Sequence, residues 1–225
     1  MAKRLCMTFL KGILAGLAIG VGGFLYVILC YAIPGEFGKI LGSLLFGVGL
    51  FTVCTFSLSL YTGKIGLVFE GKKNAEFYWS LPIMLVGNAI GAVGLGYVCF
   101  AIFRNTSVMD TVAAINAARL ALTNFESYFL VALKAFLCGF CVYMAVKLFS
   151  MNRLKPLGIL SLVVFVFLFV YCGFQHCIAN MFYFGFGNTF PAEAFINLAL
   201  CIVFNSFGPI IGVLIFKLIN RAKAA

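Results

Sequence analysis

The sequence is poor in charged residues and contains a single histidine. Charged residues make up 10% of the 225 positions, hydrophobic residues make up 64%, and the mean hydropathy is +1.14. A soluble domain carries about 25% charged residues. The composition therefore excludes a soluble globular protein and indicates a polytopic membrane protein.

Long apolar runs account for most of the chain. Each of the six is long enough to cross a bilayer, which takes about 20 residues. The sequence therefore predicts six transmembrane helices in a single domain, 1–225, with no separate soluble domain. The first run is longer than the apolar core of a signal peptide, roughly 7–15 residues, so we expect it to be retained. The runs are Phe9–Ile33, Ile40–Leu60, Phe77–Phe103, Tyr128–Phe149, Leu157–Tyr183 and Ala194–Ile219.

The net charge of +10 follows the predicted topology. With the N-terminus inside, twelve basic residues fall in cytoplasmic segments, and three (Lys39, Arg104 and Arg119) fall in outer loops. Lys134 lies within a helix. This is the positive-inside bias. It predicts a multi-pass protein of the cell (inner or plasma) membrane with both termini in the cytoplasm, whose partner is the lipid bilayer and not nucleic acid.

The only histidine, His176, lies inside an apolar run, where a titratable side chain is costly unless it faces water, a pore or a polar partner. Its ordinary pKa is near neutral pH. A core histidine with one satisfied hydrogen bond is the plain alternative. The membrane setting favours a functional role.

The two halves of the chain, roughly 1–105 and 124–225, resemble each other weakly. The segment from Lys11 to Gly16 recurs from Lys134 to Gly139, and Val86–Gly91 recurs as Val203–Gly208. Phe46 and Phe169 match at the offset that relates the two lysines. Three helices per half place the halves in opposite orientations, as in the inverted repeats of many transport proteins.

Polar and glycine residues interrupt the second and fifth apolar runs, at Ser57–Lys64 and from Gly173 to Asn180. Non-helical backbone at membrane depth persists only where protein or a water-filled cavity satisfies it. Paired interruptions in matching halves point to a substrate site. We therefore expect the two breaks to meet near the midplane, with His176 in one of them.

The residues around His176 resemble a known signature. Gly173-Phe174-Gln175-His176-Cys177-Ile178-Ala179-Asn180-Met181 is similar to the G-F-E-H-S-[IV]-A-N-M motif of the formate/nitrite transporter family. Leu60-Tyr61-Thr62-Gly63 resembles the L-[FY]-T-[GS] element of its broken second helix, and Gly87-Asn88 and Ala145-Val146 match further elements in order.

This resemblance implies an all-α, aquaporin-like protomer with six transmembrane helices, of which the second and fifth are broken, and a homopentamer with one pore per protomer. It implies passage of small monovalent anions of weak acids, namely formate, nitrite, hydrosulfide or short carboxylates, with formate ranked first. It places His176 and Thr62 at the pore centre beside Gln175 and Asn180. The implied constrictions are formed by Phe46, Phe169, Leu50, Leu60, Tyr61 and Val142.

Three positions depart from the family pattern. Gln175 stands where the family has glutamate, Gly139 aligns with an asparagine that faces the pore, and Thr123 takes the place of a vestibule lysine. Gly139 is expected to widen or rewire its layer of the pore. Arg119 or Lys134 is expected to supply the outer positive charge, and Lys64 the charge at the other end, although Lys64 also fits a plain solvated loop.

The predicted mechanism follows from desolvation. Burying a bare carboxylate costs several kcal/mol, about 3 or more, so an anion gains by becoming its neutral acid as it enters an apolar constriction. His176 could relay the proton or offer a hydrogen bond midway. Because Gln175 brings no charge, we predict that His176 is mostly neutral at neutral pH.

Alternative functions are open at this stage. A membrane thiol oxidoreductase would use Cys138 and Cys141, but a thiolate in an apolar helix is badly desolvated, and packing is the plainer role of the cysteines. A scaffold protein would not need paired breaks. The breaks carry no Asn-Pro-Ala pair, which disfavours a water or glycerol channel. We expect no enzyme activity, cofactor or metal.

Overall fold

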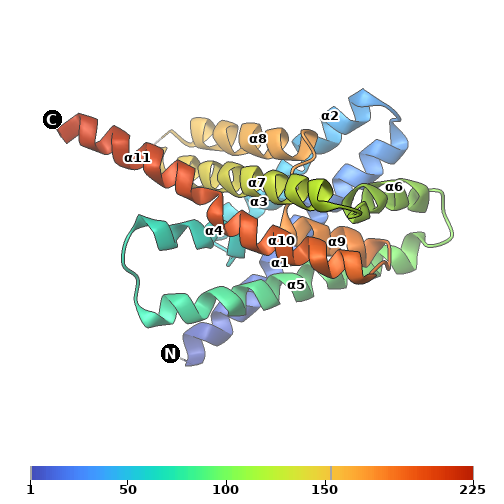
Figure 1. Cartoon of the computed structure of the whole chain (residues 1–225), viewed down its shortest axis with the longest axis horizontal. Helices are drawn as coiled ribbons and strands as arrows, with labels where there is room; N and C mark the ends of the chain where they lie inside the picture. The colour runs from blue at the N-terminus through green and yellow to red at the C-terminus, as the bar shows by residue number, and fades with distance from the viewer. Residues whose placement is uncertain (1, 153, 225) are drawn as a thin grey trace.

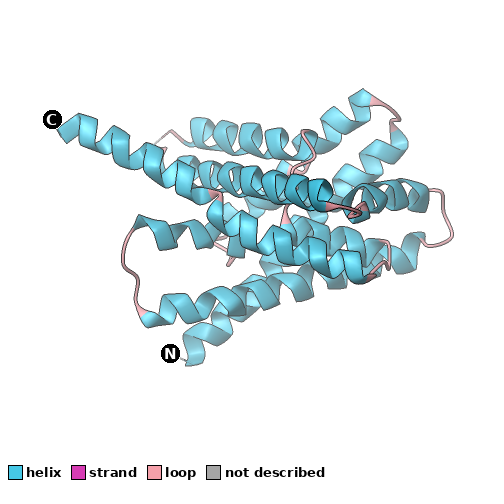
Figure 2. Cartoon of the chain, in the orientation of Figure 1, coloured by secondary structure: helices cyan, strands magenta, loops and turns pink. Residues whose placement is uncertain are grey.

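The computed structural model describes residues 2–152 and 154–224, and within these ranges the chain is built from helices and loops without a strand (Figure 1, Figure 2). Asn74 caps α5, and Asn124 with Ser127 forms a capping box at α7. The elements are α1 Ala2–Ala32, α2 Glu36–Leu45, α3 Gly47–Thr55, α4 Tyr61–Ile65, the 3₁₀ helix η1 Gly66–Glu70, α5 Ala75–Phe103, α6 Val108–Leu120, α7 Phe125–Met151, α8 Lys155–Tyr171, α9 Cys177–Phe186, α10 Ala192–Phe207 and α11 Pro209–Ala224.

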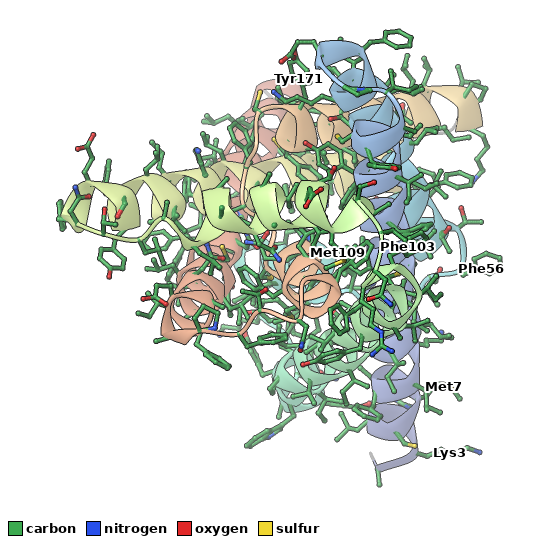
Figure 3. The ribbon with its side chains drawn as sticks, turned by 90° about the vertical axis from the view of Figure 1, so that its right-hand side faces the viewer. Lys3, Met7, Phe56, Phe103, Met109 and Tyr171 are labelled. Atoms are coloured by element: carbon green, nitrogen blue, oxygen red, sulfur yellow. The ribbon has the colours of Figure 1, made fainter. Side chains whose placement is uncertain are left out.

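Five segments of the described chain are long and apolar enough to cross a membrane. They are Ala2–Ala32, Glu36–Thr55, Ala75–Phe103, Phe125–Met151 and Ala192–Asn220. The fifth predicted run is divided between the shorter apolar helices α8 and α9. Large apolar side chains such as Met7 and Phe56 point outward, as a lipid-facing surface requires (Figure 3). The chain is a multi-pass membrane protein.

Both interruptions begin with the same helix-ending motif. After α3, the Leu58 N–H donates to the Val53 carbonyl at 2.9 Å, and Ser57 adopts φ 50°. After α8, the Phe174 N–H donates to the Phe169 carbonyl at 2.9 Å, and Gly173 adopts φ 66°. This is the Schellman arrangement, which satisfies the last carbonyls of a helix through a left-handed residue. The chain then runs extended to α4 and α9.

The two motifs also correct one part of the sequence comparison. Counted from them, Val53 holds the same position in its half as Phe169, because each carbonyl accepts the closing hydrogen bond. Phe46 lies instead at the junction of α2 and α3. Phe46 and Phe169 are therefore not equivalent positions of the two halves, although they share the offset of the lysine pair.

The short helices α4 and α9 lie between two groups of helices. α1 packs along α5, and α7 packs along α8 and α10. The N- and C-termini lie at the same end of the molecule, which also carries α4, whereas α6 lies at the opposite end (Figure 1). α6 lies in the short segment between α5 and α7. α6 buries Val108, Val112 and Asn116 and so is more than a surface helix.

Candidate functional site

His176 is the residue before α9, and its ring is hydrogen-bonded to residues of both interrupted segments. Its Nδ1 accepts the Ala179 backbone N–H at 3.1 Å, and its Nε2 lies 3.0 Å from the Thr62 hydroxyl. Because Nδ1 accepts a hydrogen bond, the proton of a neutral ring belongs on Nε2, which then donates to Thr62. Both ring nitrogens are therefore used in the neutral form, and a second proton on Nδ1 would displace the helix cap.

Two buried asparagines hold the interruptions in place with the same set of bonds. Asn88 accepts the Tyr61 N–H at 2.8 Å and donates to the carbonyls of Ser59 and Gly12, both at 2.8 Å. The pattern is typical of a side chain that replaces the missing helical bonds.

Asn205 repeats this pattern at the second interruption. It accepts the Cys177 N–H at 2.9 Å and donates to the carbonyls of Gln175 at 2.8 Å and Ala135 at 2.7 Å. Each asparagine thus accepts a hydrogen bond from the first residue of the short helix after the interruption. It also donates to the residue two positions earlier and to the first long helix of its own half. The position of His176 depends on Asn205, because Gln175 and Cys177 flank the histidine.

Phe46 and Phe169 contact each other edge to face, with ring centroids 5.7 Å apart. Phe169 also stacks on the His176 ring at 5.8 Å. The space that these rings border has a volume of about 10 Å³, no more than one water needs. The other residues implied in the constrictions, Leu50, Leu60, Tyr61 and Val142, are all buried.

Arg119, Lys134 and Gln175 line one pocket of about 340 Å³, together with Tyr26 and Thr111; we call this pocket the Arg119 vestibule. Both basic residues named as candidates for the outer charge therefore contribute to the same space. Arg119 also borders the small space beside Phe46, Phe169 and His176. The guanidinium thus lies where the vestibule meets the constriction.

Asn180 links Gln175 to Arg119. Its amide N–H groups donate to the Gln175 Oε1 at 2.7 Å and the Asn197 Oδ1 at 2.9 Å, and its Oδ1 accepts the Arg119 Nε–H at 3.0 Å. The partners of Asn180 in this network are side chains, because α6 brings Arg119 within its reach.

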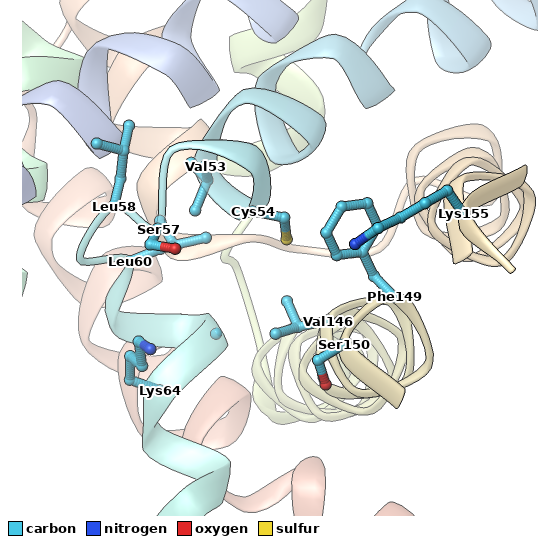
Figure 4. Close-up of a pocket in the computed structure, with 11 residues that line it drawn as sticks. Val53, Cys54, Ser57, Leu58, Leu60, Lys64, Val146, Phe149, Ser150 and Lys155 are labelled. Carbon is cyan, nitrogen blue, oxygen red and sulfur yellow. The ribbon is translucent and has the colours of Figure 1, made fainter. Parts of the chain in front are cut away.

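At the other end of the molecule, Lys64 and Lys155 line a pocket of about 240 Å³, the Lys64 vestibule (Figure 4). The wall also includes the hydroxyls of Ser57 and Ser150 and several apolar side chains, among them Leu60 and Phe149. Lys64 therefore lines a cavity and is not simply part of a solvated loop. Lys155 is a second cation of this vestibule.

Gly139 faces α10, whereas it was expected to border the pore. A Cβ atom at this position would collide with the Asn205 carbonyl oxygen, so the missing side chain lets α7 approach α10 closely. Its counterpart Gly16 meets the Asn88 carbonyl oxygen in the same way. The expectation that Gly139 widens a layer of the pore therefore does not hold, because this face of α7 packs on a helix.

Cys138 and Cys141 are free and buried, with exposures of 0% and 1%. Reactive thiols occupy accessible, electropositive positions. The structure thus gives the oxidoreductase alternative no support.

Glu70 anchors the segment that follows Thr62. Its Oε1 accepts hydrogen bonds from the Tyr143 hydroxyl and the Lys147 Nζ, both at 2.9 Å. Burial raises the pKa of Glu70, but the bonds from Lys147 and Tyr143 and the charges of Lys147 and Lys73 outweigh it and hold the pKa below the ordinary 4.5. The ionised carboxylate thereby ties η1 to α7.

Glu70→Gln is expected to lower the melting temperature in detergent by about 2–4 °C near neutral pH, because it removes an ion pair and leaves Lys147 unpaired. The pKa is lowered by folding, so this stabilisation is complete above the ordinary carboxyl pKa and is lost as the pH falls through the folded value. The difference between wild type and variant should therefore shrink in acid. Glu76→Gln is the control, since the ion-pair partner of Glu76 among the described residues is the exposed Arg4. A constant difference across pH would contradict the assignment.

Several residues of the site belong to no motif recognised in the sequence. Asn197 donates to the Arg119 carbonyl at 3.0 Å, the Ser206 hydroxyl lies 2.8 Å from that of Tyr61, and the Tyr183 ring lies under the Arg119 guanidinium. Buried polar residues in otherwise apolar helices were the one available hint.

Known proteins share the family profile and the fold of this chain. The profile of the family described as "Formate/nitrite transporter" matches residues 1–220. A solved structure described as "Pentameric formate channel with formate bound" is similar with a TM-score of 0.77 and 22% identity, over 99% of this chain and 98% of that one. A second, described as "FNT family ion channel", has a TM-score of 0.77 and 18% identity, over 100% and 92% of the two chains.

No curated protein sequence matches the chain. The two structural neighbours share the fold, and the profile match extends over nearly the whole length. With the paired interruptions and the histidine between them, the chain belongs to the formate/nitrite transporter family.

Proposed function

We propose that the protein is a channel for small monovalent anions of weak acids, and that formate is the preferred one. The observation that carries this proposal is a basic vestibule at each end of the molecule, separated by a constriction in which His176 bonds to Thr62. Positive vestibules concentrate anions. A narrow apolar passage whose polar side chains are His176 and Thr62 suits a small anion that becomes protonated as it passes.

The proposed protomer has six membrane spans in an aquaporin-like arrangement, with inverted repeats at about 1–105 and 124–225. The second span comprises α2 to α4 and the fifth comprises α8 and α9, each broken at its interruption. Five protomers form a pentamer, as the neighbouring formate channel is described to do. The positive-inside bias places both termini in the cytoplasm and the Arg119 vestibule outside the cell membrane.

The chemistry of passage follows from the geometry of the centre. A carboxylate that leaves the Arg119 vestibule meets the Phe46 and Phe169 rings, where desolvation favours its protonated form. The neutral acid then reaches His176, whose Nε2–H, or the Thr62 hydroxyl, offers it a hydrogen bond. The proton travels with the substrate in this scheme, which makes the transport proton-linked.

Reconstitution of the full chain into liposomes tests the proposal. Swelling is compared for formate, nitrite, hydrosulfide, acetate and glycerol against protein-free liposomes. We expect fast uptake of formate, slower uptake of acetate because the constriction is narrow, and no uptake of glycerol above the background. Formate uptake equal to that of empty liposomes, or glycerol uptake equal to that of formate, would overturn the assignment.

A further inference from the structure

The Arg119 guanidinium is fixed in one orientation. Its Nε–H donates to Asn180 Oδ1 at 3.0 Å, its Nη1 donates to the Ile115 carbonyl at 2.7 Å, and its central carbon lies 4.4 Å from the centroid of the Tyr183 ring. A guanidinium that is stacked on a ring and held by two hydrogen bonds loses little further conformational freedom when it binds a ligand. The plane of the group is therefore set before an anion arrives.

Within residues 2–152 and 154–224, this guanidinium has no carboxylate partner. The neighbouring side chain that could have supplied one is Gln175, which is neutral and whose Oε1 is already used by Asn180. In the same described part of the chain, neither Nη2 of Arg119 nor the Gln175 amide N–H₂ donates a hydrogen bond to protein. The vestibule is thus lined by donors and positive charge, without a competing anion of its own.

Arg119 also borders the small space beside Phe46, Phe169 and His176. An anion that moves from the vestibule toward His176 must pass along the guanidinium. The planar fork of arginine matches anions that present two oxygen atoms, such as formate, nitrite and short carboxylates. Hydrosulfide has a single acceptor atom, so it interacts with the guanidinium only as a point charge.

We propose that Arg119 is a selectivity residue that favours planar two-oxygen anions over single-centre anions at the mouth of the constriction. This inference rests on the proposed channel function and specifies its substrate class. Lys134 contributes charge to the same vestibule, but an ammonium group has no fork and does not distinguish the two classes.

The test compares Arg119→Lys with Lys134→Gln in proteoliposomes supplied with sodium formate, sodium nitrite or sodium hydrosulfide at one pH and ionic strength. Arg119→Lys keeps the charge and removes the fork, so the ratio of formate to hydrosulfide uptake should fall about tenfold. The nitrite to hydrosulfide ratio should fall likewise. Lys134→Gln should slow all three anions by similar factors and leave both ratios unchanged.

Two further measurements protect the test against a variant that fails to fold. Asn180→Asp would place a carboxylate against the guanidinium and should reduce the same two ratios. In the wild type, formate and nitrite should raise the melting temperature in detergent more than chloride does at equal ionic strength. Equal shifts for the three salts would count against a fork that binds oxygen pairs.

The outcomes separate the two proposals. If wild-type liposomes take up no anion faster than empty ones, the channel function is wrong. If the wild type conducts but Arg119→Lys slows all anions equally, the channel function stands and the selectivity role of Arg119 is overturned.

Discussion

Replacement of His176 by asparagine is expected to reduce formate uptake about tenfold or more while the protein stays folded. Asparagine is a good residue before a helix, so its side chain can still accept the Ala179 N–H. It cannot also reach the Thr62 hydroxyl as the imidazole Nε2 does at 3.0 Å. The variant therefore keeps the cap of α9 and loses the polar pair at the centre of the path.

Stopped-flow uptake in proteoliposomes measures the rate, and size-exclusion chromatography in detergent reports the fold. Thr62→Val is the matched variant on the opposite segment, since it removes the hydroxyl and keeps the shape; it should slow uptake in the same way. His176→Ala loses the cap as well and should also lower the melting temperature. Wild-type rates in both His176→Asn and Thr62→Val would remove this pair from the mechanism.

The pH profile of uptake adds a second readout. Both nitrogens of the neutral His176 ring are engaged, so charging the ring would require Nδ1 to give up the Ala179 N–H. We expect wild type and His176→Asn to follow parallel profiles near neutral pH, with faster uptake as acid raises the share of neutral formic acid. A divergence should be confined to acid conditions. Identical profiles throughout would exclude a gating role for the histidine.

Replacement of Asn205 by leucine is expected to destabilise the protein by about 3 kcal/mol or more and to abolish transport. The change leaves the Cys177 N–H and the carbonyls of Gln175 and Ala135 without their partner in the protein interior. His176 lies between Gln175 and Cys177 in the chain. Loss of the asparagine should therefore displace the histidine even in the fraction that folds.

Thermal unfolding in detergent, monitored by the loss of the monodisperse chromatographic peak, measures the first effect. Asn152→Leu is the control, because within the described residues this asparagine makes one side-chain hydrogen bond, to the Leu148 carbonyl, at the end of α7. Asn88→Leu should behave like Asn205→Leu, since Asn88 makes the matching bonds at the first interruption. A melting temperature for Asn205→Leu close to that of Asn152→Leu would contradict this account.

The sequence by itself determined the membrane class and the location of both interruptions, one of which contains His176. These properties depend on which residues are neighbours along the chain: apolar runs, a lone imidazole, and clusters of hydroxyls and glycine. Insertion into a bilayer likewise depends on the composition of consecutive residues. The motif around His176 also sufficed to predict the family, which the profile match then showed.

Only the tertiary structure decided how the side chains meet. Arg119 reaches Asn180 because α6 folds back over α9, and Gly139 faces Asn205 because α7 packs on α10. The local sequence around either residue does not report such a contact, since its partner lies far away in the chain. A helix surface offers several faces with similar composition, and the packing of distant helices selects which one lines the path. His176 was located by its neighbours in sequence, but its role depends on Thr62, which the fold brings to it from the opposite half.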